Sequence, residues 1–121
     1  MNNTNEVLAI VTEIENMRED FYRAYYNTSF TPDVRADQCV RDFSAELEAD
    51  LVELGDKTGN YKEKYLAHLR KWTAAKSRTM SPMITGPANF PAERNRKAFD
   101  REMRAWEEFQ AWRERYFKRA N

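Results

Sequence analysis

The chain has 121 residues, enough for one domain with a modest core, and its 20 basic and 20 acidic residues cancel to a net charge of zero. A single cysteine and a single histidine exclude a disulfide framework and argue against a structural zinc site. No stretch approaches the roughly 20 apolar residues of a membrane span, and the first residues lack a signal-peptide pattern. We therefore expect a soluble, cytoplasmic protein of one domain, residues 1–121.

The zero net charge hides a division along the chain. Residues 1–60 carry 5 Lys and Arg against 13 Asp and Glu, whereas residues 61–121 carry 15 against 7, so the halves have charges of −8 and +8. Either the two halves fold against each other and neutralise one another, or one face of the protein meets a charged partner.

Apolar residues recur at helical spacing, and glycine and proline are few, which predicts an all-α protein. We expect four long amphipathic helices over residues 5–26, 32–54, 61–78 and 91–119. They would form an antiparallel four-helix bundle with coiled-coil-like packing. Thr31 suits the N-cap of the second helix, Pro32 suits its first position, and Gly55 suits its end.

The second predicted helix has an acidic face opposite its apolar face. Helical spacing aligns four carboxylates on one surface, namely Asp42, Glu46, Asp50 and Glu53. Such a face is either simply solvated, or it docks basic groups or imitates a phosphate backbone. Carboxylate-bridged metal chemistry is excluded, because it uses a Glu-x-x-His element and the residue three before His68 is Tyr65.

Two residues that often carry chemistry are expected to be structural here. Cys39 lies beside the apolar face of the second helix, so inert packing is favoured over reactivity. His68 is next to Leu69 on the apolar side of the third helix, which predicts a partly buried histidine with satisfied contacts. We expect no metal and no cofactor.

The fourth predicted helix has an aromatic side and a basic side. Its apolar arc contains Phe99, Met103, Trp106, Phe109, Trp112, Tyr116 and Phe117, for which burial in the core is favoured over base stacking. Basic residues gather around the connection that precedes it: Lys71, Lys76, Arg78, Arg94, Arg96, Lys97, Arg101 and Arg104. If the third and fourth helices pair antiparallel, these cations converge at one end and either are solvated or bind a nucleic-acid backbone.

The connection between the third and fourth helices is long and rich in proline. Pro82, Pro87 and Pro91 disfavour regular helix over about a dozen residues. The segment is also apolar, since it contains Met83, Ile84 and Phe90. It either folds back over the end of the bundle or presents an apolar tip to a partner.

The same region carries a resemblance to known proteins. Its features are A-K-S-R at the start, M-I-T-G-P-A-N-F-P in the middle, R-N-x-K at the exit and W-R-E-R-Y near the end, between Lys64 and Tyr116. This segment, just under half of the chain, resembles one that recurs in proteins encoded by phages, plasmids and other mobile elements. The resemblance implies a mobile-element origin, a bacterial host and a helical hairpin, and it implies no reaction.

Catalysis is the function class that the sequence supports least. The chain has no Gly-rich phosphate loop and no spacing typical of a nucleophile with its base. We expect a non-enzymatic binding protein whose partner is a host protein or nucleoprotein complex, most simply a counter-defence inhibitor of the anti-CRISPR type. The alternative is an accessory factor that binds DNA or RNA, and long amphipathic helices also leave a homodimer open.

Overall fold

The computed structural model describes residues 12–86, 88 and 90–120, and within them the chain is all-helical, as the sequence predicts. The helices are α2 (Arg18–Tyr26), α3 (Pro32–Leu54), α4 (Tyr61–Lys76), the short α5 (Pro82–Thr85) and α6 (Ala92–Ala120). Residues 12–15 form a further helical stretch before α2. Residues 5–11 of the predicted first helix, and Pro87 of the connection, lie outside the described residues.

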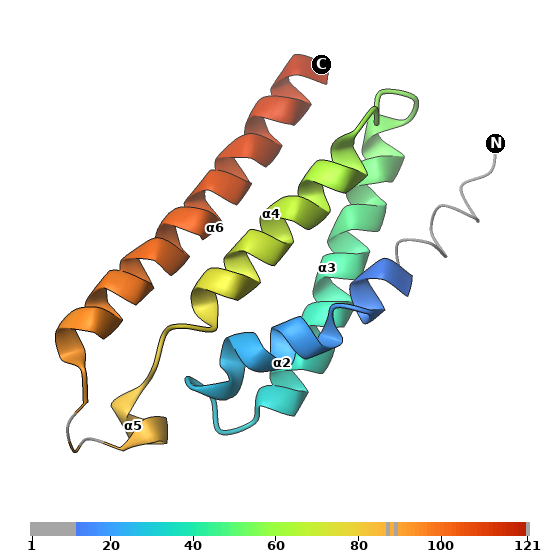
Figure 1. Cartoon of the computed structure of the whole chain (residues 1–121). Coiled ribbons are helices and arrows are strands. Elements are labelled where there is room, and N and C mark those ends of the chain that lie inside the picture. Colours follow the sequence, from blue (N-terminus) through green and yellow to red (C-terminus); the bar gives the residue numbers. More distant parts are fainter. Residues whose placement is uncertain (1–11, 87, 89, 121) are drawn as a thin grey trace.

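Helix α4 lies at the centre of the molecule. It packs against α6 on one side and against α2 and α3 on the other, and α2 also packs along α3. Figure 1 shows α3, α4 and α6 running in alternating directions, with α2 crossing the lower part of α3. Helix α6 therefore meets the rest of the chain mainly through α4.

The seam between α4 and α6 is an aromatic core. Tyr61 stacks on Trp112 with ring centroids 4.8 Å apart, and the ring of Trp72 lies 5.2 Å from that of Trp106. Phe109 of α6 is fully buried in the same core. Each buried ring removes roughly 150–250 Å² from water, so these contacts dominate the packing of the hairpin.

The first predicted helix is interrupted before α2 begins. Residues 16–17 form a turn in which the Met17 amide donates to the Ile14 carbonyl (3.0 Å), and α2 starts at Arg18. The side chains of Ile14 and Met17 are both buried, so residues on both sides of the turn contribute to the same buried apolar surface. The prediction of a continuous helix up to residue 26 is therefore wrong, because apolar spacing does not reveal such a turn.

Helix α3 has the predicted bounds, although the expected N-cap hydrogen bond of Thr31 is absent. Pro32 holds its first position, but the side chain of Thr31 makes no capping hydrogen bond, and the Thr31 amide donates to Ser29 Oγ (3.0 Å). At the other end, Gly55 has a φ of 62°, and its amide donates to the Leu51 carbonyl (3.1 Å). Glycine adopts this left-handed conformation without a steric penalty, which explains why the helix stops there.

The connection contains one turn of helix, α5, where the prolines predicted none. Ser81 Oγ accepts a hydrogen bond from the Met83 amide (3.2 Å), and Pro82 occupies the first position, where its missing amide proton is not needed. The Ser81 amide donates to the Asn27 carbonyl at the end of α2 (2.9 Å). Helix α4 ends at Lys76, two residues before its predicted end. The connection thus folds back onto the end of α2 and the first turns of α6.

Candidate functional site

Four basic side chains of the predicted cluster form a row on one face of α6. Arg94, Lys97, Arg101 and Arg104 follow spacings of three and four residues, which places them within one arc of the helix. All four are exposed, and none makes an ion pair with another described residue. Arg78, just after α4, is also exposed and without an ion pair to the described residues. We call the four residues of α6 the basic stripe; it spans about 15 Å along the helix.

Two other members of the predicted cluster form ion pairs with carboxylates. Lys71 pairs with Glu108 of α6 (3.0 Å), and Arg96 pairs with Glu93 (2.6 Å). The hydrogen bond and charge of Lys71, together with the charge of Arg104, lower the pKa of Glu108. The Lys71–Glu108 pair therefore lies next to the basic stripe and partly offsets its charge.

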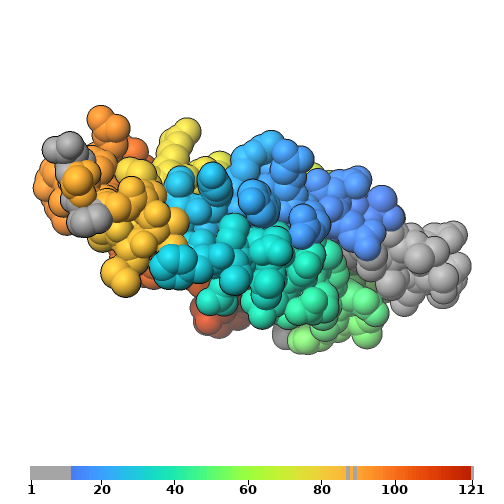
Figure 2. Space-filling view, turned by 90° about the horizontal axis from the view of Figure 1, so that it is seen from below, coloured from blue at the N-terminus to red at the C-terminus, as the bar shows by residue number. Residues whose placement is uncertain are grey.

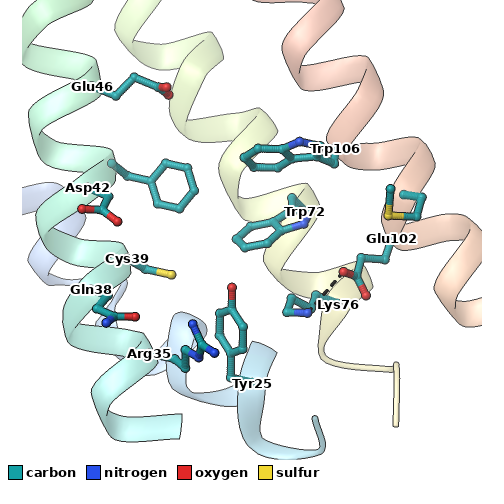
Figure 3. Close-up of a pocket in the computed structure, with 12 residues that line it drawn as sticks. Tyr25, Arg35, Gln38, Cys39, Asp42, Glu46, Trp72, Lys76, Glu102 and Trp106 are labelled. Atoms are coloured by element: carbon teal, nitrogen blue, oxygen red, sulfur yellow. Dashed lines mark hydrogen bonds and ion pairs between the residues drawn. The ribbon is translucent and has the colours of Figure 1, made fainter. Parts of the chain in front are cut away.

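Lys76 does not belong to an exposed cluster, which corrects the prediction. Its side chain is 13 % exposed, and its Nζ lies 3.2 Å from Glu102 Oε2 and 4.6 Å from the centre of the Tyr25 ring. Figure 3 shows the Lys76–Glu102 pair between α4 and α6. Lys76 is close in sequence to exposed cations. However, it lies on the side of α4 that faces α6, so its side chain is largely buried against Glu102.

Two cations outside the predicted cluster, Lys64 and Arg115, lie near His68. Burial lowers the pKa of His68, and the positive charges of Lys71, Arg115 and Lys64 lower it further. Lys64 and Arg115 are both exposed. They lie far apart along the chain and far from the connection, so only the antiparallel pairing of α4 with α6 brings them together. The ring of His68 stacks on that of Phe109 (5.6 Å), in line with the predicted structural role.

The predicted connection tip is mostly covered. Met83 is 79 % exposed, whereas Ile84 and Phe90 are half-buried. The amide of Met80 donates to Asn95 Oδ1 of α6 (2.6 Å), which holds the start of the connection to the first turns of that helix. Of the three predicted tip residues, only Met83 projects.

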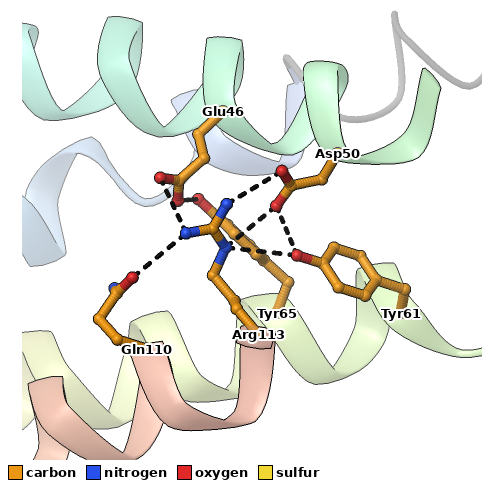
Figure 4. A network of polar contacts seen from close by, with 6 residues as sticks. All are labelled: Glu46, Asp50, Tyr61, Tyr65, Gln110 and Arg113. Carbon is orange, nitrogen blue, oxygen red and sulfur yellow. Dashed lines mark hydrogen bonds and ion pairs between the residues drawn. The ribbon is translucent and has the colours of Figure 1, made fainter. Parts of the chain in front are cut away.

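The acidic face of α3 is divided, and this corrects the prediction that its four carboxylates share one surface. Asp50 is buried, and its Oδ1 accepts a hydrogen bond from Arg113 Nη2 of α6 (3.0 Å) while its Oδ2 accepts from the Tyr61 hydroxyl. Glu46 Oε1 accepts from the Tyr65 hydroxyl (2.6 Å), and Glu46 Oε2 lies 3.4 Å from Arg113 Nη1. Figure 4 shows this network bridging α3, α4 and α6.

The two tyrosines of the network have raised pKa values. Burial, followed by the hydrogen bond to Asp50, raises the pKa of Tyr61. Burial, followed by the hydrogen bond to Glu46, raises the pKa of Tyr65. Both hydroxyls therefore stay protonated and act as donors to the carboxylates at neutral pH.

Of the four predicted acidic residues, Asp42 and Glu53 are exposed. Among the described residues, no group of His, Cys, Asp and Glu is placed to hold a metal ion. Cys39 is buried, and burial raises the pKa of its thiol to about 11, so the reactive thiolate is scarce at neutral pH.

Comparison with known proteins found no matching family model, no matching curated protein and no matching solved structure. The likeness of Lys64–Tyr116 to mobile-element proteins therefore rests on its sequence motifs alone. Within the described part of the chain, no helix is both long enough and apolar enough to cross a membrane.

Proposed function

We propose that the protein is a non-enzymatic binding protein that holds nucleic acid through the basic stripe of α6. The supporting observation is a row of four exposed cations, free of ion pairs with described residues, over about 15 Å of one helix. Duplex DNA carries one negative charge per roughly 1.7 Å of axis, so the row can face several phosphates. Contacts of this kind supply affinity without sequence preference.

The setting of this proposal is a mobile element in the cytoplasm of a bacterial host. The proposal assumes the four-helix antiparallel bundle predicted from the sequence. In this arrangement, α6 contacts mainly α4 and leaves the basic stripe exposed. A homodimer would present two basic stripes and so strengthen binding to a long nucleic acid.

Fluorescence anisotropy with labelled duplex and single-stranded DNA across a salt series tests the proposal. If four phosphates are neutralised, the logarithm of the binding constant should fall with the logarithm of salt concentration with a slope of about −3.6 for duplex DNA. Arg94→Ala combined with Lys97→Ala removes half of the stripe and should halve that slope.

The matched control is Arg41→Ala combined with Arg70→Ala, which removes two exposed charges outside the stripe. It should leave the slope unchanged. An equal loss of affinity in both double variants would mean that net charge alone matters, and absence of binding at the lowest salt would remove the proposal.

A second candidate function is inhibition of a host nucleoprotein, which the resemblance to mobile-element proteins favours. The observation that supports it is an apolar end of the molecule, where Tyr26, Phe30, Val34 and Met83 are 56 %, 77 %, 48 % and 79 % exposed. Figure 2 views this end and shows α5 beside the connection between α2 and α3. Exposed apolar patches of this kind often mark protein-binding surfaces.

Target cleavage by purified CRISPR effector complexes is the measurement for this second candidate. We expect the wild-type protein to inhibit one of them, and Phe30→Ser combined with Met83→Ser to relieve the inhibition while DNA binding is retained. Val52→Ser, at a residue that is 65 % exposed elsewhere on α3, is the control. Inhibition that survives the double variant would show that the apolar end is not the contact.

A further inference from the structure

A groove between α3 and α6 opens on a different side of α6 from the basic stripe. Its cavity volume is about 570 Å³, which lies within the range of roughly 300–1,000 Å³ typical of ligand sites. Aromatic side chains from four helices form its walls, namely Tyr25, Phe43, Trp72 and Trp106. Figure 3 shows three of them, Tyr25, Trp72 and Trp106. Phe99 and Met103 of α6, expected in the core, are 47 % and 39 % exposed, and Met103 lines the groove.

Carboxylates outnumber cations among the residues that line the groove. Asp42, Glu46 and Glu102 face Arg35 and Lys76, which leaves a net charge of −1. Asp42 is exposed and has no ion pair with a described residue. Glu102 accepts from Lys76 through Oε2, while its buried Oε1 has no hydrogen-bond partner among the described residues. The groove therefore has acceptors to spare for a positively charged donor.

Three cations lie at the two ends of the groove. Arg35 and Lys76 lie over the ring of Tyr25, at 5.9 and 4.6 Å from its centre, and Lys76 is also paired with Glu102. At the other end, Arg113 lies 3.4 Å from Glu46. A ligand with positive charges spread along the groove would meet these cations, whereas one positive charge in the middle would meet carboxylates and ring faces.

We propose that the groove receives a single arginine side chain of a partner protein. The planar guanidinium carries one charge, binds a carboxylate such as that of Asp42 through two donors, and stacks on aromatic faces such as that of Trp106. Its apolar stem packs on the remaining aromatic walls. Because this surface is separate from the basic stripe, the protein can hold a protein partner and a nucleic acid at the same time.

The test uses a short peptide, acetyl-Gly-Arg-Gly-amide, titrated into the isotope-labelled full-length protein and followed by NMR. The indole N–H signals of Trp72 and Trp106 report on the groove, and Trp112, which does not line it, is the internal reference. We expect saturable shifts of the first two signals within about 10 mM peptide, a range that detects dissociation constants of ~1 mM. The same peptide with citrulline, which has the shape of arginine but no charge, should cause no saturable shift.

Asp42→Asn should weaken arginine-peptide binding about tenfold, because it removes a charge-assisted bond, with Glu53→Gln as the matched control on α3. Both residues are exposed, and circular dichroism should show unchanged helicity. No saturable shift, an equal response to citrulline, or an unchanged affinity of Asp42→Asn would overturn the proposal. Saturation by spermidine but not by the arginine peptide would overturn it in favour of a polyamine. Asp42 lies on α3, outside the basic stripe, so we expect Asp42→Asn to bind DNA like the wild type, and failure here is distinct from failure of the basic stripe.

Discussion

Arg113 is a side chain of α6 that forms ion pairs with carboxylates of α3. Its guanidinium makes two hydrogen bonds with Asp50, from Nη2 to Oδ1 (3.0 Å) and from Nε to Oδ2 (3.1 Å). The side chains of Arg113 and Asp50 are 21 % and 9 % exposed. A charge pair at this depth is costly to break on one side only, because the remaining charge stays in a poorly solvated place.

We expect Arg113→Met to lower the free energy of unfolding by about 3 kcal/mol, at the low end of the ~3–5 kcal/mol for one-sided loss of a buried pair. The low end applies because Arg113 keeps some solvent exposure. Methionine retains the apolar stem, so the loss reports on the charge pair. Urea denaturation followed by circular dichroism measures the change.

Two further variants make this prediction specific. Arg115→Met, at an exposed residue of the same helix, should stay within about 0.5 kcal/mol of the wild type. Arg113→Met combined with Asp50→Asn should recover part of the loss, since both charges are then absent. If Arg113→Met alone unfolds like the wild type, the network does not contribute to stability.

The roles of Asp50 and Lys76 could not be read from their own helices. Asp50 shares its spacing with Asp42 and Glu46, so the sequence predicts that they lie on one common surface. Its partners Tyr61 and Arg113 come from α4 and α6, and their approach depends on the register of three helices. Periodicity describes one helix at a time and contains no information on that register.

At the scale of elements, local chemistry predicted the helix ends better than spacing did. Pro32 and Gly55 bound α3 as expected, because each acts through its own backbone conformation. The turn at residues 16–17 and the helical turn α5 were missed. The hydrogen bonds at residues 16–17 are local ones that apolar spacing does not encode, whereas the start of α5 is also held by the bond from the Ser81 amide to the Asn27 carbonyl.

The hydrogen bond from the Met80 amide to Asn95, which joins the connection to α6, leads to a prediction at this scale. Asn95→Ala should lower the free energy of unfolding by about 1 kcal/mol, because the half-buried amide of Met80 loses its acceptor. Asn95→Asp keeps an oxygen at that position and should stay close to the wild type. Urea denaturation measures the stability, and limited proteolysis should cut residues 77–91 faster in the alanine variant alone. Equal behaviour of the two variants would show that this bond does not hold the connection.

At the scale of the whole molecule, the two oppositely charged halves touch through few ion pairs. Among the described residues, Glu13 pairs with Lys62 (2.9 Å), and Arg113 pairs with the carboxylates of α3. The remaining ion pairs between described residues join groups within one half. Mutual neutralisation is therefore local, and the basic stripe on the outer side of α6 keeps its charge.

The sequence by itself determined the helical class, the bounds of α3, the aromatic core of the α4–α6 hairpin and the exposed cations of the basic stripe. These follow from the spacing of side chains along one helix and from backbone preferences, which act locally. Only the tertiary structure decided that Lys76 and Asp50 turn inward, that the connection folds back, and that aromatic and acidic side chains from four helices line one groove. Those features depend on how the helices are placed against one another, because each joins side chains from different elements.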